Sequence, residues 1–327
     1  MKKIIGLILI GMMLLVGCGE KQESKDGTKE LTLVLDYTPN TNHTGIYVAK
    51  ELGYFAEEGI ELNIVQPPQD GAPVLVASGK AQVGIDYQDT IAAAYAQDEP
   101  LPVTNIAALV QHNTSGIVSL KGNGMDRPKG MEGKKYATWG MEVEQAMIKN
   151  VVEKDGGDFS KVQLVPSNYS DIFTGLGNDI DAVWIFYGWD GIAAQVKNVA
   201  VDYFAFKDIN PVFDYYTPTI IANNEFLKED PETAKAFLRA LKKGYEYSIE
   251  NPKEAAEILL KDNPELDSAL VMASQEYLKD EYISEAKRWG EFDSTRWNNF
   301  YAWLFENGLI EKEIPADFGF SNEYLPE

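Results

Sequence analysis

The chain has 327 residues, with 29 Lys and Arg against 51 Asp and Glu, which gives a formal net charge of −22 at pH 7. Phosphate contacts need clustered Lys and Arg, so a polyanion of this kind is a poor nucleic-acid binder, and we expect no nucleic-acid partner. The length is sufficient for two lobes with separate hydrophobic cores.

The first residues have the pattern of a secretory signal. Lys2 and Lys3 precede an apolar run at residues 4–16, which is short for a membrane span, and Cys18 is the only cysteine. The pattern resembles bacterial lipoprotein signals. That resemblance implies removal of residues 1–17 and several acyl chains on Cys18, which would anchor the protein on the extracytoplasmic face of the cell membrane. The alternative for Cys18 is burial in an ordinary helix.

Residues 18–30 are mostly polar and lack hydrophobic periodicity, which predicts a tether between the lipid and the folded body. No second apolar stretch reaches membrane-spanning length, so the lipid is the only anchor we expect. With Cys18 modified, the body has neither a disulfide nor a thiol nucleophile.

Strands and helices are predicted to alternate from residue 31 onwards. The first series comprises a strand at 31–36, a strand at 61–65, a helix at 74–78, a strand at 83–86 and a helix at 89–96. The second comprises a strand at 135–138, a helix at 142–153, a strand at 162–165, a helix at 171–176 and a strand at 182–186. Apolar strands separated by helices indicate βαβ units and parallel sheets buried on both faces.

The pattern becomes helical after a strand at 219–222. Helices are predicted at 231–251, 252–261, 266–278 and 295–307. The order predicts an α/β protein of two lobes joined by two crossings, near Ser115–Leu120 and residues 216–222. Lobe I would comprise residues 31–118 and 221–327, including the helical tail, and lobe II residues 119–220.

Several motifs resemble those of one family. Residues 35–50 (LDYTPNTNHTGIYVAK) and 53–59 (GYFAEEG) resemble the opening of thiamine-pyrimidine binding proteins, within a group that includes fungal pyrimidine synthases and sulfonate or nitrate binding proteins. Residues 111–116 (QHNTSG), 137–140 (ATWG) with Glu144, and 184–191 (WIFYGWDG) support the closer match. Family members often carry Trp where this chain has Tyr37, and Glu where it has Asp190.

This resemblance implies a periplasmic-binding-protein-like fold of type II and a small pyrimidine ligand held between the lobes. The ligand would be formylaminopyrimidine or hydroxymethylpyrimidine, captured for thiamine salvage. The permease and ATPase subunits of an ABC importer would be its partners. We expect a monomer with no cofactor and no metal.

Ligands of α/β sheets collect beyond the carboxyl ends of strands, which selects the candidate residues of lobe I. A tyrosine can stack on a heteroaromatic ring, and amide, imidazole and carboxylate groups can hydrogen-bond to it. The alternatives are core packing, helix capping and turn chemistry. The candidates are Tyr37, Asn40, His43, Asp86, Tyr87, Asn113 and Ser115.

The candidates of lobe II follow the predicted strands at 135–138 and 182–186. Glu144 could accept from the amino group of an aminopyrimidine, and helix capping is its alternative. Tyr187 and Trp189 could form an aromatic wall opposite Tyr37. Asp190 is either a ligand contact or a helix cap. The candidates are Trp139, Glu144, Tyr187, Trp189 and Asp190. Tyr215 and Tyr216, near the second crossing, are weaker candidates. Trp289, Trp297 and Trp303 are predicted to pack among the C-terminal helices.

Two other functions are compatible with this sequence. A receptor for a sulfonate, nitrate or flavin shares the fold, but an anion needs Arg, Lys or concentrated backbone N–H donors. The fungal synthases carry a cysteine-rich, iron-linked motif, and this chain has no cysteine outside Cys18. Since phosphate-loop and metalloprotease motifs are also absent from the sequence, we expect no enzyme activity.

Overall fold

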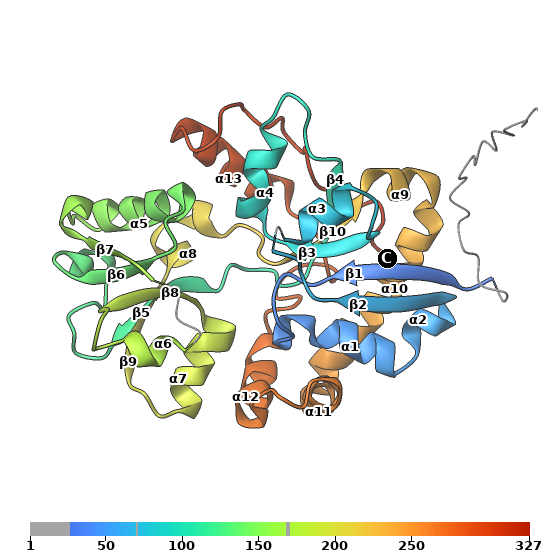
Figure 1. Cartoon of the computed structure of the whole chain (residues 1–327), viewed down its shortest axis with the longest axis horizontal. Coiled ribbons are helices and arrows are strands. Elements are labelled where there is room, and N and C mark those ends of the chain that lie inside the picture. Colours follow the sequence, from blue (N-terminus) through green and yellow to red (C-terminus); the bar gives the residue numbers. More distant parts are fainter. Residues whose placement is uncertain (1–26, 70, 168–170) are drawn as a thin grey trace, which may run out of the picture.

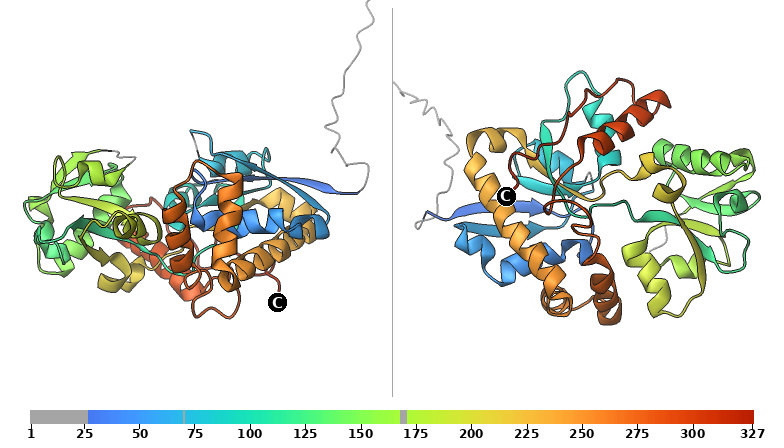
Figure 2. Two further views of the ribbon diagram at one scale, coloured as in Figure 1. Left: turned by 90° about the horizontal axis from the view of Figure 1, so that it is seen from below. Right: turned by 180° about the vertical axis from the view of Figure 1, so that it is seen from behind.

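The computed structural model describes residues 27–69, 71–167 and 171–327. The predicted signal, Cys18 and most of the predicted tether lie outside these residues. Two α/β lobes lie side by side along the long axis of the molecule (Figures 1 and 2). Each lobe is built on one five-stranded sheet, in the order β2-β1-β3-β10-β4 in lobe I and β7-β6-β8-β5-β9 in lobe II.

The strands follow the apolar runs of the sequence. Those of lobe I are β1 (Lys29–Val34), β2 (Ile60–Val65), β3 (Val83–Asp86), β4 (Val103–Ala108) and β10 (Thr219–Asn223). Those of lobe II are β5 (Ser115–Leu120), β6 (Lys135–Thr138), β7 (Gln163–Pro166), β8 (Ala182–Phe186) and β9 (Val201–Ala205). β1 begins within the predicted tether, two residues before the predicted start of the folded body.

The helices of lobe I before the first crossing are η1 (Thr41–His43), α1 (Thr44–Glu51), α2 (Tyr54–Glu57), α3 (Ala72–Ala77) and α4 (Gln88–Tyr95). Those of lobe II are η2 (Pro128–Met131), α5 (Glu142–Lys154), η3 (Phe159–Lys161), α6 (Ile172–Gly175), η4 (Tyr187–Gly191), α7 (Ile192–Val196), α8 (Phe206–Ile209) and η5 (Pro211–Phe213). The tail forms α9 (Asn224–Glu229), α10 (Pro231–Glu250), α11 (Pro252–Asp262), α12 (Ser268–Leu278) and α13 (Ser294–Glu306).

Both sheets are mixed, which corrects the prediction of parallel sheets. β1 runs parallel to β2 and β3, and β6 runs parallel to β7 and β8. β10 is antiparallel to β3 and β4, and β5 is antiparallel to β8 and β9. β5 and β10 each enter a sheet directly from the other lobe, without the crossover helix that makes neighbouring strands parallel.

The sheets place both crossings a few residues from the predicted positions. The whole of Ser115–Leu120 is β5 and pairs with β8, so the first connection lies at residues 109–114. Thr219 already pairs with Asp86 in lobe I, so the second connection ends before it. The predicted limits at 118/119 and 220/221 therefore fall inside strands.

Helices cover both faces of the lobe I sheet. Side chains of α1 and α10 pack with alternate residues of β1 and β3, such as Leu33 and Val83, in one core cluster. The opposite face packs against α3, α4 and α13. α10 begins at Pro231 after the N-cap Asp230, whose carboxylate accepts from the N–H of Thr233 at 3.3 Å.

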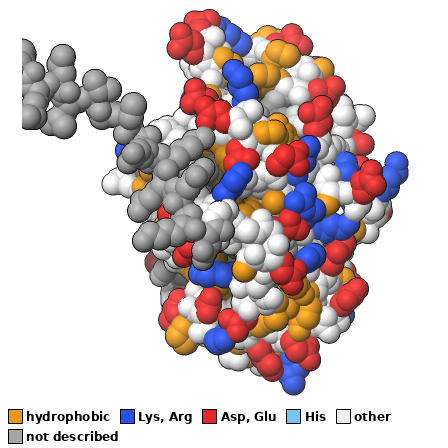
Figure 3. Space-filling view, turned by 90° about the vertical axis from the view of Figure 1, so that its right-hand side faces the viewer, with side chains coloured by type: hydrophobic (Ala, Val, Ile, Leu, Met, Phe, Trp, Pro, Cys, Tyr) orange, Lys and Arg blue, Asp and Glu red, His pale blue; other side chains and the backbone are white. Residues whose placement is uncertain are grey.

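β1 begins at the end of lobe I that is farthest from lobe II (Figure 1). That end carries acidic and basic side chains interspersed (Figure 3). Within the described part of the chain, no helix has the length and hydropathy to cross a membrane.

Candidate functional site

The carboxyl ends of β1 and β3 in lobe I face the carboxyl ends of β6 and β8 in lobe II (Figure 1). Rings from the two lobes meet there: Tyr87, after β3, stacks on Phe186, the last residue of β8, with 6.4 Å between ring centroids and 26° between planes. This junction is where an α/β fold collects its ligands. Tyr87 is a predicted site residue, whereas Phe186 is not among the predicted site residues.

Asp36 ties the end of β1 to two predicted residues. The side chain of His43 is fully buried, and its Nε2 lies 2.7 Å from Asp36 Oδ1, while the Tyr87 hydroxyl donates to Asp36 Oδ2 at 2.5 Å. His43 Nδ1 accepts from the backbone N–H of Asn40 at 3.3 Å, so Nε2 carries the proton donated to Asp36. The pKa of Asp36 is lowered: burial opposes the charged form, but the interaction with His43 and the Tyr87 hydroxyl outweigh it. Sequence reasoning missed Asp36.

Two further carboxylates lie at the start of α4. Asp86 Oδ1 accepts from Thr90 Oγ1 at 2.9 Å, and Asp89 Oδ2 accepts from the Tyr215 hydroxyl at 3.1 Å. The other oxygen of each carboxylate is buried and has no hydrogen-bond partner among the described residues. Burial raises the pKa of Asp86 to about 7 and that of Asp89 to about 6. Asp86 was predicted and Asp89 was not.

The described hydrogen bonds and ion pairs of Asp36, Asp86 and Asp89 involve histidine, tyrosine and threonine partners, and no lysine or arginine is among them. The lobe I side of the junction is therefore acidic, and among the described partners of these carboxylates the His43 ring alone can carry a balancing positive charge. Such a surface favours ligands that donate hydrogen bonds or carry positive charge.

Tyr37 and Asn40 lie in the loop after β1. Tyr37 is 63% exposed, which is unusual for a large aromatic side chain, and it is available to a ligand at the rim. Asn40 is the N-cap of η1: its oxygen accepts from the N–H of Asn42 at 2.9 Å, and its amide donates to the Thr38 carbonyl at 3.0 Å. Local capping accounts for the contacts of Asn40.

Asn113 and Ser115 are fully buried at the first crossing. Asn113 donates to the carbonyl of Phe213 at 2.8 Å and accepts from the N–H of Ser115 at 2.8 Å, so it joins the two crossings. Ser115 Oγ has no hydrogen-bond partner among the described residues. Asn113 thus holds the hinge, whereas the hydroxyl of Ser115 is unused.

Glu144 fixes the loop between β6 and α5. Its carboxylate accepts from the Tyr136 hydroxyl at 2.5 Å, from Thr138 Oγ1 at 3.0 Å and from the N–H of Trp139 at 3.1 Å. It also accepts from the N–H of Met141 at 3.3 Å, as a capping-box glutamate does. These donors occupy both oxygens of the carboxylate, so Glu144 has the helix-capping role that was the alternative to a ligand contact. The Trp139 side chain stays 48% exposed, with its ring 5.6 Å from that of Trp184.

The predicted aromatic wall after β8 is divided between two sides. Tyr187 lies 4.8 Å from the ring of Tyr203 and 5.5 Å from that of Tyr277, away from the Tyr87–Phe186 contact. Trp189 packs against a cluster that includes Tyr47 and side chains of α11 and α12. Asp190 is partly buried in η4, and burial raises its pKa to about 6.

The remaining aromatic candidates mostly support the framework. Tyr215 stacks on Phe300 at 4.1 Å while its hydroxyl holds Asp89, so it joins the second crossing to the candidate site. The Tyr216 hydroxyl accepts from Arg296 at 2.7 Å. The three tryptophans assigned to packing, namely Trp289, Trp297 and Trp303, are buried.

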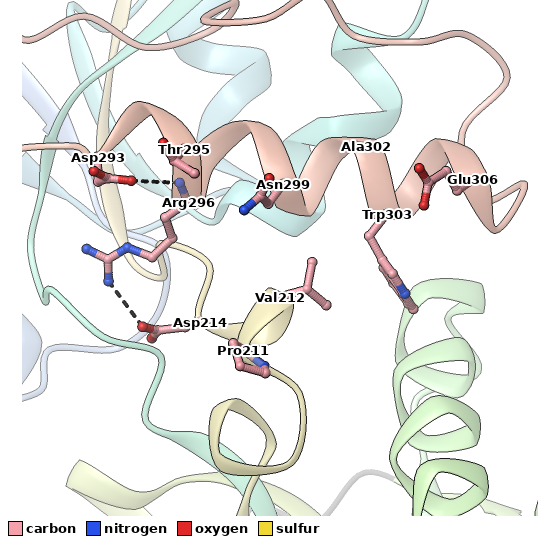
Figure 4. A pocket seen from close by; sticks show the side chains of 10 residues that line it. All are labelled: Pro211, Val212, Asp214, Asp293, Thr295, Arg296, Asn299, Ala302, Trp303 and Glu306. Atoms are coloured by element: carbon pink, nitrogen blue, oxygen red, sulfur yellow. Dashed lines mark hydrogen bonds and ion pairs between the residues drawn. The ribbon is translucent and has the colours of Figure 1, made fainter.

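Two cavities lie beside the hinge, and neither is lined by Asp36, Tyr87 or Phe186. One of ≈ 460 Å³ lies between α13 and the segment around Asp214, with Arg296 and Trp303 in its wall (Figure 4). The other, of ≈ 380 Å³, is lined by Thr114 and the three tyrosines Tyr187, Tyr203 and Tyr277. Among the predicted site residues, Tyr187 lines the second cavity.

Sequence comparison with known proteins identifies the family of this chain. A family model described as NMT1/THI5 like matches residues 40–255. The chain belongs to this family. It is 30% identical over 334 residues to the formylaminopyrimidine-binding protein of Halalkalibacterium halodurans, covering 98% of both chains. It is also 26% identical over 324 residues to the 4-amino-5-hydroxymethyl-2-methylpyrimidine phosphate synthase THI5 of Saccharomyces cerevisiae, covering 91% of this chain and 88% of the relative.

The fold of this NMT1/THI5-like protein is that of solved binding proteins. The periplasmic aliphatic sulphonate binding protein SsuA of Escherichia coli superposes with a TM-score of 0.70 at 14% identity, covering 91% of this chain and 94% of SsuA. The predicted periplasmic-binding-protein-like fold of type II is therefore confirmed. At this identity the likeness concerns the fold alone.

Proposed function

We propose that the protein is the extracytoplasmic solute-binding lipoprotein of an ABC importer and captures a thiamine-related aminopyrimidine for thiamine salvage. Formylaminopyrimidine is the first candidate ligand, and hydroxymethylpyrimidine is the second. The observation that carries the proposal is the acidic and aromatic junction between the lobes, where Asp36 holds the hydroxyl of Tyr87, whose ring stacks on Phe186 of the other lobe. The relative named as a formylaminopyrimidine-binding protein supports the ligand class.

The chemistry of the junction suits an aminopyrimidine ligand better than it suits an anionic ligand. An aminopyrimidine offers N–H donors to carboxylates and a flat face to aromatic rings. The described partners of Asp36, Asp86 and Asp89 include no lysine or arginine, so a sulfonate or nitrate would lack a strong cationic partner among them. Tyr37 and Trp139, exposed on opposite lobes, would then cover the ring when the lobes close.

Closure would couple ligand capture to transport. Two short connections join the lobes, so a ligand that contacts both sides favours the closed arrangement by its differential affinity for that arrangement. The permease and ATPase subunits would bind the closed form.

The test is isothermal titration calorimetry with formylaminopyrimidine, hydroxymethylpyrimidine and an alkanesulfonate. We expect submillimolar or tighter binding of at least one pyrimidine and no detectable heat with the sulfonate. Binding of the sulfonate alone would refute the proposal.

A pyrimidine synthase is the second candidate function, because several curated relatives carry that name. Among 327 residues the chain has a single cysteine, Cys18, which argues against a cysteine-dependent reaction in the folded body. Incubation with pyridoxal phosphate and iron, followed by mass spectrometry, should yield no pyrimidine. Formation of a pyrimidine product would favour the synthase.

A further inference from the structure

Four buried polar atoms at or just after the end of β3, at the start of β5 and on β8 have no hydrogen-bond partner among the described residues: Asp86 Oδ2, Asp89 Oδ1, Ser115 Oγ and Trp184 Nε1. Buried polar groups are normally hydrogen-bonded, because an unpaired one is costly in a medium of low dielectric constant. Ser115 is fully buried and Trp184 is 5% exposed, so bulk solvent does not satisfy them. A donor and an acceptor, one on each lobe, are thus left for a ligand.

The acceptor on lobe I is held in one orientation. Asp89 lies in the first turn of α4, and its Oδ2 accepts from the Tyr215 hydroxyl at 3.1 Å. Tyr215 is itself fixed by stacking on Phe300 at 4.1 Å. Since Oδ2 is occupied, Oδ1 is the oxygen left to accept from a ligand.

The donor on lobe II belongs to the same face of its sheet as the junction. Trp184 precedes Phe186 by two residues on β8, and side chains two residues apart in a strand point to the same face. Phe186 pairs with Ser115 in the register of β5 and stacks on Tyr87 of lobe I. The Trp184 ring lies 5.6 Å from that of the exposed Trp139, which places it next to the rim of the junction.

The two sides are joined through the hinge. Ser115 donates its N–H to Asn113 at 2.8 Å, and Asn113 donates to the carbonyl of Phe213 at 2.8 Å, two residues before Tyr215, which holds Asp89. The unpaired oxygen of Asp89 and the hydroxyl of Ser115 therefore lie on one framework that joins the two crossings.

We propose that Asp89 and Trp184 determine which heterocycle binds: Asp89 Oδ1 accepts from the exocyclic amino group, and Trp184 Nε1–H donates to a ring nitrogen or carbonyl oxygen. This inference rests on the proposed function and names the donor and acceptor pattern that the site selects. A 4-aminopyrimidine presents its amino donor to Asp89. The matching 4-oxopyrimidine presents an acceptor there, which leaves a desolvated carboxylate facing an oxygen.

The Asp89→Asn substitution makes the inference testable, because it inverts one hydrogen-bonding group without changing its shape. The Tyr215 hydroxyl is a donor and would keep the amide oxygen of the new residue as its partner. The amide nitrogen would then take the place of Oδ1 and offer a donor instead of an acceptor.

The experiment is calorimetric titration of the full chain with 4-amino-5-hydroxymethyl-2-methylpyrimidine and with its 4-oxo counterpart. We expect the wild type to prefer the amino compound by at least about 100-fold, since a site with buried polar groups rejects the mismatched analogue strongly. Asp89→Asn should reduce that ratio at least tenfold. Trp184→Phe should weaken binding of both compounds about tenfold with little change in their ratio.

Trp289→Phe is the matched control. Trp289 Nε1 is also buried without a described partner, but Trp289 packs on Tyr245 in the core of lobe I. It should lower the melting temperature without changing either affinity.

If Asp89→Asn prefers the amino compound over the oxo compound as strongly as the wild type does, the inference is overturned. The proposed function would still stand in that case, because the wild type binds the aminopyrimidine. A wild type that binds neither compound would overturn the inference, and it would overturn the proposed function as well if formylaminopyrimidine also fails to bind. If Asp89→Asn fails to fold, Trp184→Phe provides the second variant: unchanged affinity for both compounds would contradict the proposed donor role of Trp184 and overturn the inference.

Discussion

The hinge should be stabilised by a charged histidine, and this contribution should disappear in alkaline solution. His112 lies on the first crossing, with Nδ1 2.6 Å from Asp214 Oδ2 on the second crossing and Nε2 2.7 Å from Glu285 Oε2. Its pKa is raised, chiefly by the hydrogen bond to Asp214, against the opposing effects of burial and of Arg296. The protonated ring therefore ties both crossings to the segment between α12 and α13.

The expected magnitude follows from exposure. His112 and Asp214 are 20% and 19% exposed, so their charged hydrogen bond should contribute about 1.5–3 kcal/mol. Glu285 is 69% exposed, and a pair with so exposed a partner contributes at most about 1 kcal/mol. Replacing His112 with Gln should therefore lower the free energy of unfolding by about 2–3 kcal/mol near pH 6.

The sign of the pH dependence follows from the direction of each pKa shift. A histidine whose pKa is raised on folding contributes its full stabilisation below its unfolded pKa, and loses it as the pH rises through the folded pKa. The pKa of Asp214 is lowered mainly because His112 outweighs burial, and that of Glu285 is lowered to about 2, so their contributions are lost only in acid. The stabilisation should thus be largest between about pH 5 and pH 6.5.

Urea unfolding of the wild type and His112→Gln at pH 6 and pH 9 provides the assay. The difference between the two proteins should shrink at pH 9, where Arg296, 3.3 Å from Asp214, remains as a partner for that carboxylate. A difference that is equal at both pH values would refute the reasoning, because the contribution would then not depend on the charge of His112.

Three other predictions follow from single contacts. Glu144→Gln should lower the free energy of unfolding, measured with urea, by about 2–4 kcal/mol. The reason is that the amide has one accepting oxygen, whereas both carboxylate oxygens of Glu144 accept hydrogen bonds. An unchanged free energy of unfolding would contradict the capping role of Glu144. Tyr37→Ala and Trp139→Ala should each weaken aminopyrimidine binding by roughly five- to a hundredfold in calorimetry, through lost stacking, with little change in melting temperature since both side chains are exposed. Cys18→Ser should abolish palmitate labelling and release the protein from membranes; membrane retention would count against the lipoprotein proposal.

Much of the fold could be predicted from local patterns. The predicted strand at 83–86 matches β3, and the predicted helix at 231–251 matches α10 to within one residue. These elements were predictable because apolar periodicity and capping residues such as Asp230 act within a few residues along the chain. The strands β4, β5 and β9 were missed, and the antiparallel entry of β5 and β10 depends on which lobe each strand joins.

The sequence by itself determined the acidic character of the chain, its element order and the likeness of its motifs to pyrimidine-binding proteins. Only the tertiary structure decided which of the candidate side chains remain available. Glu144 is used by its own loop, whereas Asp36 and Asp89, which have no distinguishing sequence signal, are held at the junction by His43 and Tyr215. The physical reason is that hydrogen-bond occupancy depends on partners distant in sequence, such as Asp89 and Tyr215, which meet only where the second crossing returns the chain to lobe I.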